Sequence, residues 1–322
     1  MRNALFVLIL FAFSACEAPK VPLPSVTGKA GELVVVMNET LWKQAAGDTV
    51  FNSLSQHVYG LPQPEPMFNV VHIKKNAFSK IFQSHRNILV ANIGEGHQKK
   101  IELKSNVWAT PQIVVEISAP DAATFIQLFT ESLNRIISQV LKKEEERTLR
   151  SYRAQINHDA VALLSSNHFL KLAIPKGYNI ARTEADFTWL RYETKDVTQS
   201  ILVYTEPYKR PNTFTKDGMV SVADSITKIF VPGPTKGTYM STYLEYPPLF
   251  TETALANIYT SSLKGLWHVD GALMGGPFVI YALLDEPRNR VIYLHGFVFA
   301  PGKNKRNYLR QVEAIINSLE VI

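Results

Sequence analysis

Apolar and polar positions follow two rhythms along residues 31–157. Short runs rich in Val and Ile predict buried strands, and between them apolar residues recur every three or four positions, as on one face of a helix. The strand-like runs are 31–37, 67–73, 86–93 and 106–118, and the helix-like segments are 38–56 and 76–85. Residues 60–66 (GLPQPEP) contain three prolines and predict a stiff, exposed connection. The alternation favours an α/β or α+β sandwich.

The clearest helix of the sequence begins after Ser118, a candidate N-cap. Apolar residues recur at spacings of three and four from Phe125 to Leu141, so one face of this helix is expected to be buried. The run KKEEER at 142–147 then predicts a solvated helical surface rather than a binding tail. The pattern weakens around residues 150–166, where we expect the boundary between two domains.

Residues 158–322 mostly alternate with a period of two, which predicts antiparallel strands in a meander. A turn is expected at 175–177 (PKG), a short amphipathic helix at 221–230 and a longer one at 304–322. This order resembles the sandwich of the PsbP and Mog1-type proteins, a resemblance of fold that implies no function. The predicted fold class is therefore α/β (α+β), with two sandwich-like units, each a mostly antiparallel sheet covered by helices.

The composition is that of a globular protein with no strong preference for a charged partner. The 322 residues are 46% hydrophobic, and 34 Lys and Arg against 28 Asp and Glu give a net charge of +6. This excess is small for so long a surface, so nucleic acid is not predicted as a partner. Anionic lipid is the only partner that the short basic clusters modestly favour.

The amino terminus has the layout of a signal peptide. Arg2 supplies a positive charge, residues 4–13 form an apolar run of ten, and two small residues precede Cys16. Ten residues are too few to span a bilayer core, which needs about 20. A buried helix is the alternative, but the segment lacks a one-sided polar pattern and a Pro- and Gly-rich tether follows it.

The stretch from Phe13 to Cys16 resembles the bacterial lipobox, although Leu is usual where Phe13 stands. The resemblance implies that Cys16 becomes the first residue of the mature protein and carries several acyl chains, which hold a protein stably on a membrane. The protein is then expected in the cell envelope, lipid-anchored and facing the periplasm. The alternative is a plain secretory signal cut after Ala15. Cys16 is the only cysteine of the sequence, so an intramolecular disulfide is excluded in both cases.

These observations predict four segments. They are a lipoprotein signal peptide at 1–15, a flexible tether at 16–30, a first α/β domain at 31–157 and a second α+β domain at 158–322.

Four longer blocks carry a family resemblance. Residues 61–68, 85–93, 274–301 and 305–319 resemble recurring blocks of a bacterial lipoprotein family known as domain of unknown function 4837. The resemblance runs over nearly the whole mature chain. It implies a lipidated envelope protein, with no assigned activity and no established site residues.

The sequence offers no motif of the common catalytic classes. The eight histidines never form the i, i+4 pair around a glutamate that zinc proteases use, and no Gly-x-Ser-x-Gly elbow or Gly-rich phosphate loop occurs. We therefore predict no catalytic residue, metal ligand or cofactor. An enzyme whose carboxylates meet only in the fold stays open as an alternative.

Two polar clusters are candidate ligand sites. Arg86, with His85 beside it and Glu65 in the proline-rich segment, has the chemistry to grip a carboxylate or phosphate. The alternative is that His85 caps a helix end and Arg86 pairs with a local acid.

The second cluster joins Trp267, His268 and Asp270 to the segment 274–277 (MGGP), which we expect to be flexible, as a rim of a binding groove. The alternative is a glycine-rich hairpin turn with Trp267 in the core.

The functional expectation is a membrane-anchored protein that binds or scaffolds an envelope protein or a small ligand, and that is not an enzyme. A binding module predicts a concave patch, whereas a scaffold predicts a broad flat apolar surface. The alternative, an envelope hydrolase, requires two or three of His85, His268, Asp270 and Glu65 to converge.

Overall fold

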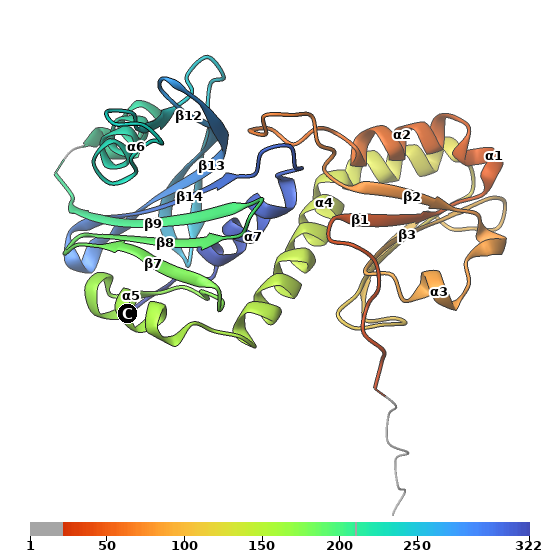
Figure 1. The fold of residues 1–322 in the computed structure, drawn as a ribbon. Helices are drawn as coiled ribbons and strands as arrows, with labels where there is room; N and C mark the ends of the chain where they lie inside the picture. Colours follow the sequence, from red (N-terminus) through yellow and green to blue (C-terminus); the bar gives the residue numbers. More distant parts are fainter. Residues whose placement is uncertain (1–21, 210) are drawn as a thin grey trace, which may run out of the picture.

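Two β-sheets lie side by side in the computed structural model of the protein, which describes residues 22–209 and 211–322. A long helix, α4, runs between them (Figure 1). The predicted signal peptide and the lipid attachment at Cys16 lie outside the described residues. The fold class predicted from the sequence, mixed α/β with helices covering the sheets, is confirmed.

The first sheet has five strands in the order β2-β1-β3-β5-β4. The strands are β1 Glu32–Val36, β2 Asn69–Ile73, β3 Asn87–Ile93, β4 Lys100–Ser105 and β5 Ile113–Ala119. β1 is parallel to β2 and to β3, and β3 is parallel to β5, so that only β4 is antiparallel. The expectation of a mostly antiparallel sheet is wrong here, because helical turns between the strands return the chain to the same end of the sheet.

Helical elements lie on both faces of the first sheet. The elements are α1 Glu39–Trp42, α2 Ala45–Leu54, the 3₁₀ turn η1 Lys75–Ala77, α3 Lys80–Gln83 and α4 Ala122–Arg153. α2 and α4 bury their apolar sides against one face, with Val50, Leu54 and Phe125 fully enclosed. Phe78, between η1 and α3, packs against the other face. The N-cap of α4 is Asp121, whose carboxylate accepts the backbone N–H of Thr124 at 2.8 Å, and not Ser118 as expected.

The second sheet has eight strands, all antiparallel to their neighbours, as predicted. Its order is β10-β12-β13-β14-β9-β8-β7, and β11 also pairs with β12. The strands are β7 Tyr178–Thr183, β8 Phe187–Glu193, β9 Thr198–Pro207, β10 Met240–Thr242, β11 Leu249–Leu255, β12 Ile258–Val269, β13 Ala272–Asp285 and β14 Arg290–Phe299. The short strands β6 Leu170–Lys171 and β15 Glu320–Val321 form a separate pair.

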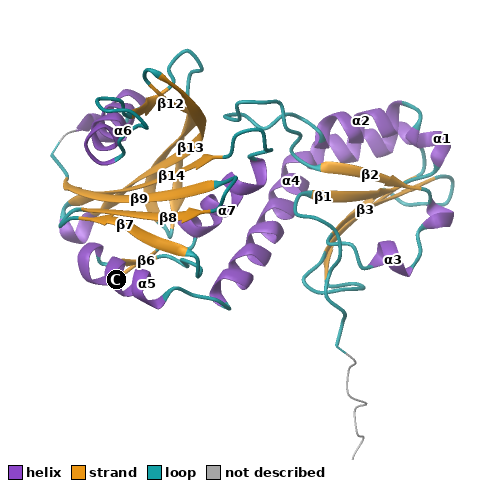
Figure 2. Ribbon diagram, in the orientation of Figure 1, coloured by secondary structure: helices purple, strands orange, loops and turns teal. Residues whose placement is uncertain are grey.

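The two faces of the second sheet carry different helices (Figure 2). The helical elements are α5 His158–His168, η2 Pro211–Phe214, α6 Lys216–Phe230, η3 Glu286–Arg288 and α7 Arg306–Asn317. α5 and α7 share a core with one face, and α6 shares a core with the other. Successive strand residues point to opposite faces, so Ile201 and Val203 of β9 lie in the α7 core while Leu202 lies in the α6 core.

The proline-rich segment 60–66 is not the exposed connection that we expected. Leu61 is 7% exposed and packs in the core beneath α7, and Glu65 is 3% exposed. The segment therefore joins the two halves of the molecule.

Candidate ligand-binding site

Glu65 lies at the start of helix α7. Its carboxylate oxygens accept the backbone N–H groups of Lys305 at 2.6 Å and of Arg306 at 3.0 Å. These N–H groups have no partner within the helix, and a carboxylate also complements the positive end of the helix dipole. The candidate ligand residue Glu65 is therefore a helix cap.

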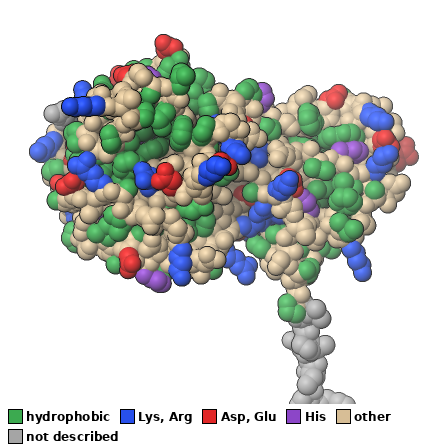
Figure 3. Space-filling view, viewed as in Figure 1, with side chains coloured by type: hydrophobic (Ala, Val, Ile, Leu, Met, Phe, Trp, Pro, Cys, Tyr) green, Lys and Arg blue, Asp and Glu red, His purple; other side chains and the backbone are tan. Residues whose placement is uncertain are grey.

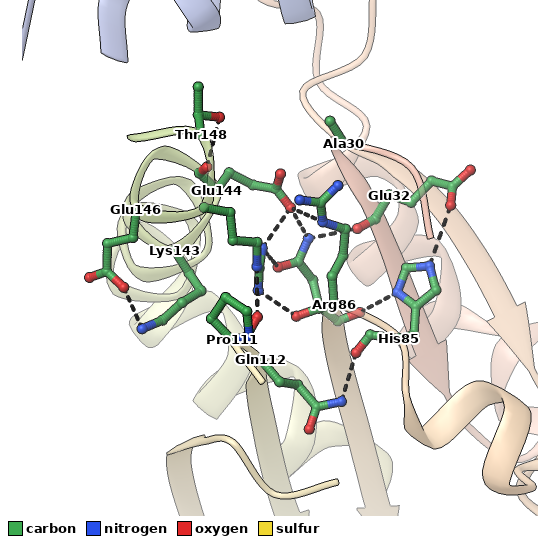
Figure 4. A network of polar contacts seen from close by, with 12 residues as sticks. Ala30, Glu32, His85, Arg86, Pro111, Gln112, Lys143, Glu144, Glu146 and Thr148 are labelled. Carbon is green, nitrogen blue, oxygen red and sulfur yellow. Dashed lines mark hydrogen bonds and ion pairs between the residues drawn. The ribbon is translucent and has the colours of Figure 1, made fainter. Parts of the chain in front are cut away.

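His85 and Arg86 lie at the start of β3, where their partners come from the protein itself (Figure 4). The His85 ring nitrogens lie 3.3 Å from the carbonyl oxygen of Asn87 and 3.4 Å from the carboxylate of Glu32. Arg86 Nε is 3.1 Å from a carboxylate oxygen of Glu144. The pairing of Arg86 with a local acid corresponds to the alternative given for this cluster.

The carboxylate of Glu144 belongs to a buried polar network that includes Arg147, one turn further along α4 (Figure 4). Arg147 donates to Glu144 at 2.8 Å, to the Asn87 side chain at 3.0 Å, and to the backbone oxygens of Arg86 and Pro111 at 2.7 Å each. Burial lowers the pKa of Arg147 to about 10, and the nearby Glu144 carboxylate opposes this shift. The network holds α4 against the first sheet.

Trp267, His268 and Asp270 separate into a buried and an exposed part. Trp267 is 4% exposed and packs edge-on against Phe297, with ring centres 5.7 Å apart. His268 points to the other side of β12, where its Nε2 is 3.7 Å from the carboxylate of Asp270. Both side chains of this pair are well exposed.

Of the four residues named for a hydrolase, only two that are close in sequence approach each other, at 3.7 Å and on the exposed side of β12. Glu65 caps α7, His85 lies against the first sheet, and only His268 and Asp270 are near each other. Within residues 22–209 and 211–322, no group of three or more His, Cys, Asp or Glu side chains could hold a metal ion. The helices of the same ranges include none that is long and apolar enough to cross a membrane.

A cavity of about 350 Å³ lies on the α6 face of the second sheet, and Trp267 is part of its wall. Figure 3 shows hydrophobic side chains gathered over this part of the surface, beside α6. Six strands of the sheet, β8, β9, β10, β12, β13 and β14, and the segment after α6 line the cavity. The apolar lining consists of Trp189, Val197, Val231, Pro232, Pro234, Met240, Trp267, Val269, Met274, Phe297, Phe299 and Pro301. We call this cavity the α6 groove.

The polar groups of the two tryptophans are already bonded inside the protein. Trp189 Nε1 donates to the hydroxyl of Ser200 at 3.1 Å, and Trp267 Nε1 donates to the carbonyl oxygen of Val298 at 3.3 Å. Neither indole N–H is left for a ligand, so these aromatic side chains offer it only apolar surface.

Gly276 brings β13 close to the wall of the groove. A Cβ at this position would lie 2.0 Å from the carbonyl oxygen of Val298 and 3.0 Å from Trp267 Nε1, so no other residue fits without a shift of β14. Gly275 and Gly276 pair with His268 and Trp267 inside the sheet. The expected flexible segment 274–277 is therefore part of strand β13, next to a shift in the pairing register between His268 and Val269.

Charged side chains stand at one end of the groove. Arg191 and Glu193 form an ion pair of 3.0 Å, and Asp196 lies 3.6 Å from Lys303. Lys195 is exposed beside them. We call this set the charged rim.

The sequence analysis named Trp267 as a groove residue but not the other aromatic side chains that line the α6 groove. A usable signal was present, because Phe297 and Phe299 stand two positions apart in β14 and therefore share a face. Which strand would lie beside them could not be read from that spacing.

The fold and the groove define a two-sheet mixed α/β protein with an apolar cavity. The chain belongs to the family described as Domain of unknown function (DUF4837), whose model matches residues 157–318. A second model, Domain of unknown function (DUF8532), matches residues 26–153. Two of the four blocks that suggested the family thus lie in the second model, so the resemblance does not extend over the first half.

Several solved structures are similar to the chain. The Ran-binding protein Mog1p of Saccharomyces cerevisiae is 8% identical, with 48% of this chain and 90% of that chain covered and a TM-score of 0.31. LpqN, involved in cell envelope biogenesis of Mycobacterium tuberculosis, is 12% identical, with 46% and 79% covered and a TM-score of 0.28. A comparison with curated proteins finds no match.

Proposed function

We propose that this protein is an envelope lipoprotein, anchored through acylated Cys16, that binds an acyl chain of a lipid in the α6 groove. Two independent features support the proposal: the lipobox-like stretch from Phe13 to Cys16, and an apolar cavity of about 350 Å³ on the second sheet. Ligand cavities for small molecules run from roughly 300 to 1,000 Å³.

The observation that carries this choice of ligand is the internal bonding of both indole N–H groups, of Trp189 and Trp267. A peptide placed in the groove would bury backbone N–H and C=O groups against apolar walls, which is costly without hydrogen-bond partners. A hydrocarbon chain has no such groups, and the flexible Met240 and Met274 adapt to its shape.

The charged rim suits the polar end of the same ligand. Arg191, Lys195 and Lys303 face two acids there, Glu193 and Asp196, which leaves one positive charge in excess. A headgroup at the rim stays in water while the acyl chain is buried. The groove is concave, as expected for a binding module rather than a scaffold.

Two experiments test the proposal. The first replaces Cys16 by Ser and follows the protein in membrane fractions. Loss from the membrane is expected, because the acyl chains provide the attachment. A variant that still fractionates with the membrane in a detergent-sensitive manner would contradict the anchor.

The second experiment measures quenching of tryptophan fluorescence by a brominated fatty acid. Trp189 and Trp267 line the groove, so an acyl chain inside it brings bromine into contact with both rings. Met274→Asp is expected to abolish the quenching, since it places a charge in the wall. Leu273→Asp is the matched control, because Leu273 directly precedes Met274 in β13, does not line the groove and is fully exposed. Equal quenching in both variants would refute binding in the groove.

A further inference from the structure

A second cavity, of about 340 Å³, lies on the opposite face of β8 and β9 from the α6 groove. Trp189 and Arg191 of β8 face the groove, whereas Tyr192 faces this cavity, as the alternation of a strand requires. Its other walls come from the end of α4, the turn at 175–177 and the first turns of α7. We call it the tyrosine cavity.

Four tyrosines, Tyr152, Tyr178, Tyr192 and Tyr308, line the tyrosine cavity. In the part of the chain that the structure describes, none of their hydroxyl groups makes a hydrogen bond. The hydroxyl groups of Tyr152, Tyr192 and Tyr308 can each donate and accept a hydrogen bond at the cavity, because a phenol does both, whereas that of Tyr178 is buried behind them.

Tyr178 is the most informative of the four. Its side chain is 2% exposed, and its hydroxyl is buried without a partner among the described residues. Burial raises the pKa of Tyr178 well above its usual range, so the hydroxyl stays protonated and able to donate. Native proteins rarely leave a buried polar group unsatisfied, because this costs free energy. A bound ligand with hydroxyl groups would supply the missing partner after a small movement of the rings around it.

The walls of the tyrosine cavity are held in place by the backbone. The N–H of Lys176 donates to the carbonyl oxygen of Gln155 at 2.7 Å, which joins the turn to the end of α4. Gly177 has φ +96°, and a Cβ there would lie 3.1 Å from the Tyr192 ring. On the far side, Gln199 donates to the backbone oxygen of Tyr308 at 2.9 Å. The backbone around the cavity is therefore held in place before any ligand arrives, and only side-chain rings have to move.

We propose that the tyrosine cavity binds a neutral, polyhydroxylated ligand, a saccharide. Tyrosine rings offer flat apolar faces to the C–H face of a sugar ring, and phenol hydroxyls with carboxamides of Gln155 and Gln311 match its hydroxyl groups. No carboxylate lines the cavity, and its one charged side chain, Lys176, is exposed.

A peptide strand fits this cavity less well. β8 lies between β7 and β9, and β9 lies between β8 and β14, so neither strand presents a free edge for an added strand. β7 is the edge strand of the sheet, but only its first residue, Tyr178, lines the cavity. The proposal is independent of lipid binding in the α6 groove, which lies on the other face of the sheet.

Saturation-transfer NMR on the full chain tests the proposal, with chitotetraose, cellotetraose and maltotetraose as probes at millimolar concentrations. At least one of the three is expected to bind. Tyr192→Phe and Tyr308→Phe are each expected to weaken that binding roughly two- to tenfold, the effect of one lost hydrogen bond. Tyr239→Phe, the same change at a tyrosine outside the cavity, is the matched control and should bind as the unchanged protein does.

Three results would overturn the proposal: no binding of any of the three saccharides, equal affinity in all the variants, or binding of short peptides in place of the saccharides. Met274→Asp separates the two sites. This change removes lipid binding but is expected to leave saccharide affinity unchanged, so failure of one proposal is distinguishable from failure of the other.

Discussion

The carboxylate of Glu65 accepts a hydrogen bond of 3.0 Å from the backbone N–H of Arg306, 241 residues further along the chain. A second bond, from Lys305, completes the cap of α7. One buried side chain of the proline-rich segment thus fixes the start of the helix that covers the second sheet.

Replacing Glu65 by Gln should lower the free energy of unfolding by about 1–2 kcal/mol, because one charged acceptor at the positive end of the helix becomes a neutral amide. Urea unfolding measures this loss. Glu95→Gln is the control, since Glu95 is exposed, and its effect should stay within about 0.5 kcal/mol. Equal effects of the two changes would show that the cap contributes nothing.

The buried polar network around Glu144 predicts a larger loss of unfolding free energy. Glu144→Leu leaves the guanidinium groups of Arg86 and Arg147 without their shared carboxylate, which should cost about 3–5 kcal/mol. Glu146→Leu, two residues along the same helix, removes only the pair between an exposed carboxylate and the half-buried Lys143, and should cost less than about 1 kcal/mol. Thermal or urea unfolding distinguishes them, and similar losses would contradict the structural role of Glu144.

Tyr178→Phe should stabilise the protein without ligand by about 1 kcal/mol, because it removes a buried hydroxyl that has no partner. Tyr293 provides the opposite case. It is equally buried, but its hydroxyl donates to Glu206 at 3.0 Å, so Tyr293→Phe should destabilise by about 1 kcal/mol. The two midpoints of unfolding should therefore move in opposite directions. A loss of stability in Tyr178→Phe would mean that its hydroxyl is already satisfied.

His295 predicts a loss of stability in mild acid. It is buried beside the rings of Phe278 and Phe297, and burial lowers its pKa to about 3, whereas an unfolded histidine titrates near about 6.5. The stability that the neutral, buried His295 provides is fully present above the pKa of the unfolded state. It declines as the pH falls from there toward the pKa of the folded state, because in this range only the unfolded chain takes up the proton. At about pH 5 the loss should reach about 2 kcal/mol.

Urea unfolding at about pH 7 and about pH 5 checks this dependence. His295→Leu should remove about 2 kcal/mol of the difference between the two conditions, while His97→Leu, at an exposed position, should leave it unchanged. If the stability of His295→Leu depends on pH as that of the unchanged protein does, His295 is not the group responsible for the loss in acid.

Much of the local structure followed from periodicity. The apolar face of α7, with Leu309, Val312 and Ile316, is buried as its spacing of three and four predicted, and the strands of the second sheet follow the period of two. β4 was missed because it is an edge strand with alternating charges, and the local pattern of Lys and Glu resembles a solvated segment.

Only part of the candidate site could be predicted from the sequence. Trp267 could be named because a large aromatic residue beside glycines is conspicuous in one stretch of sequence. Glu144 and Arg147 could not, because in KKEEER they are indistinguishable from their exposed neighbours until α4 is laid against β3. The role of Glu65 was equally hidden, since its partners are backbone groups far along the chain.

The sequence by itself determined most of the helices and strands and their buried apolar sides, since hydrophobic period and local geometry act within a few residues. It also carried the lipobox-like stretch at Phe13 to Cys16. The tertiary structure alone decided that the first sheet is mostly parallel, that Glu65 caps α7, and that two cavities lie back to back across β8 and β9. Such features depend on which distant segments of the chain come into contact. The sequence of a single strand does not say which other strand will lie beside it.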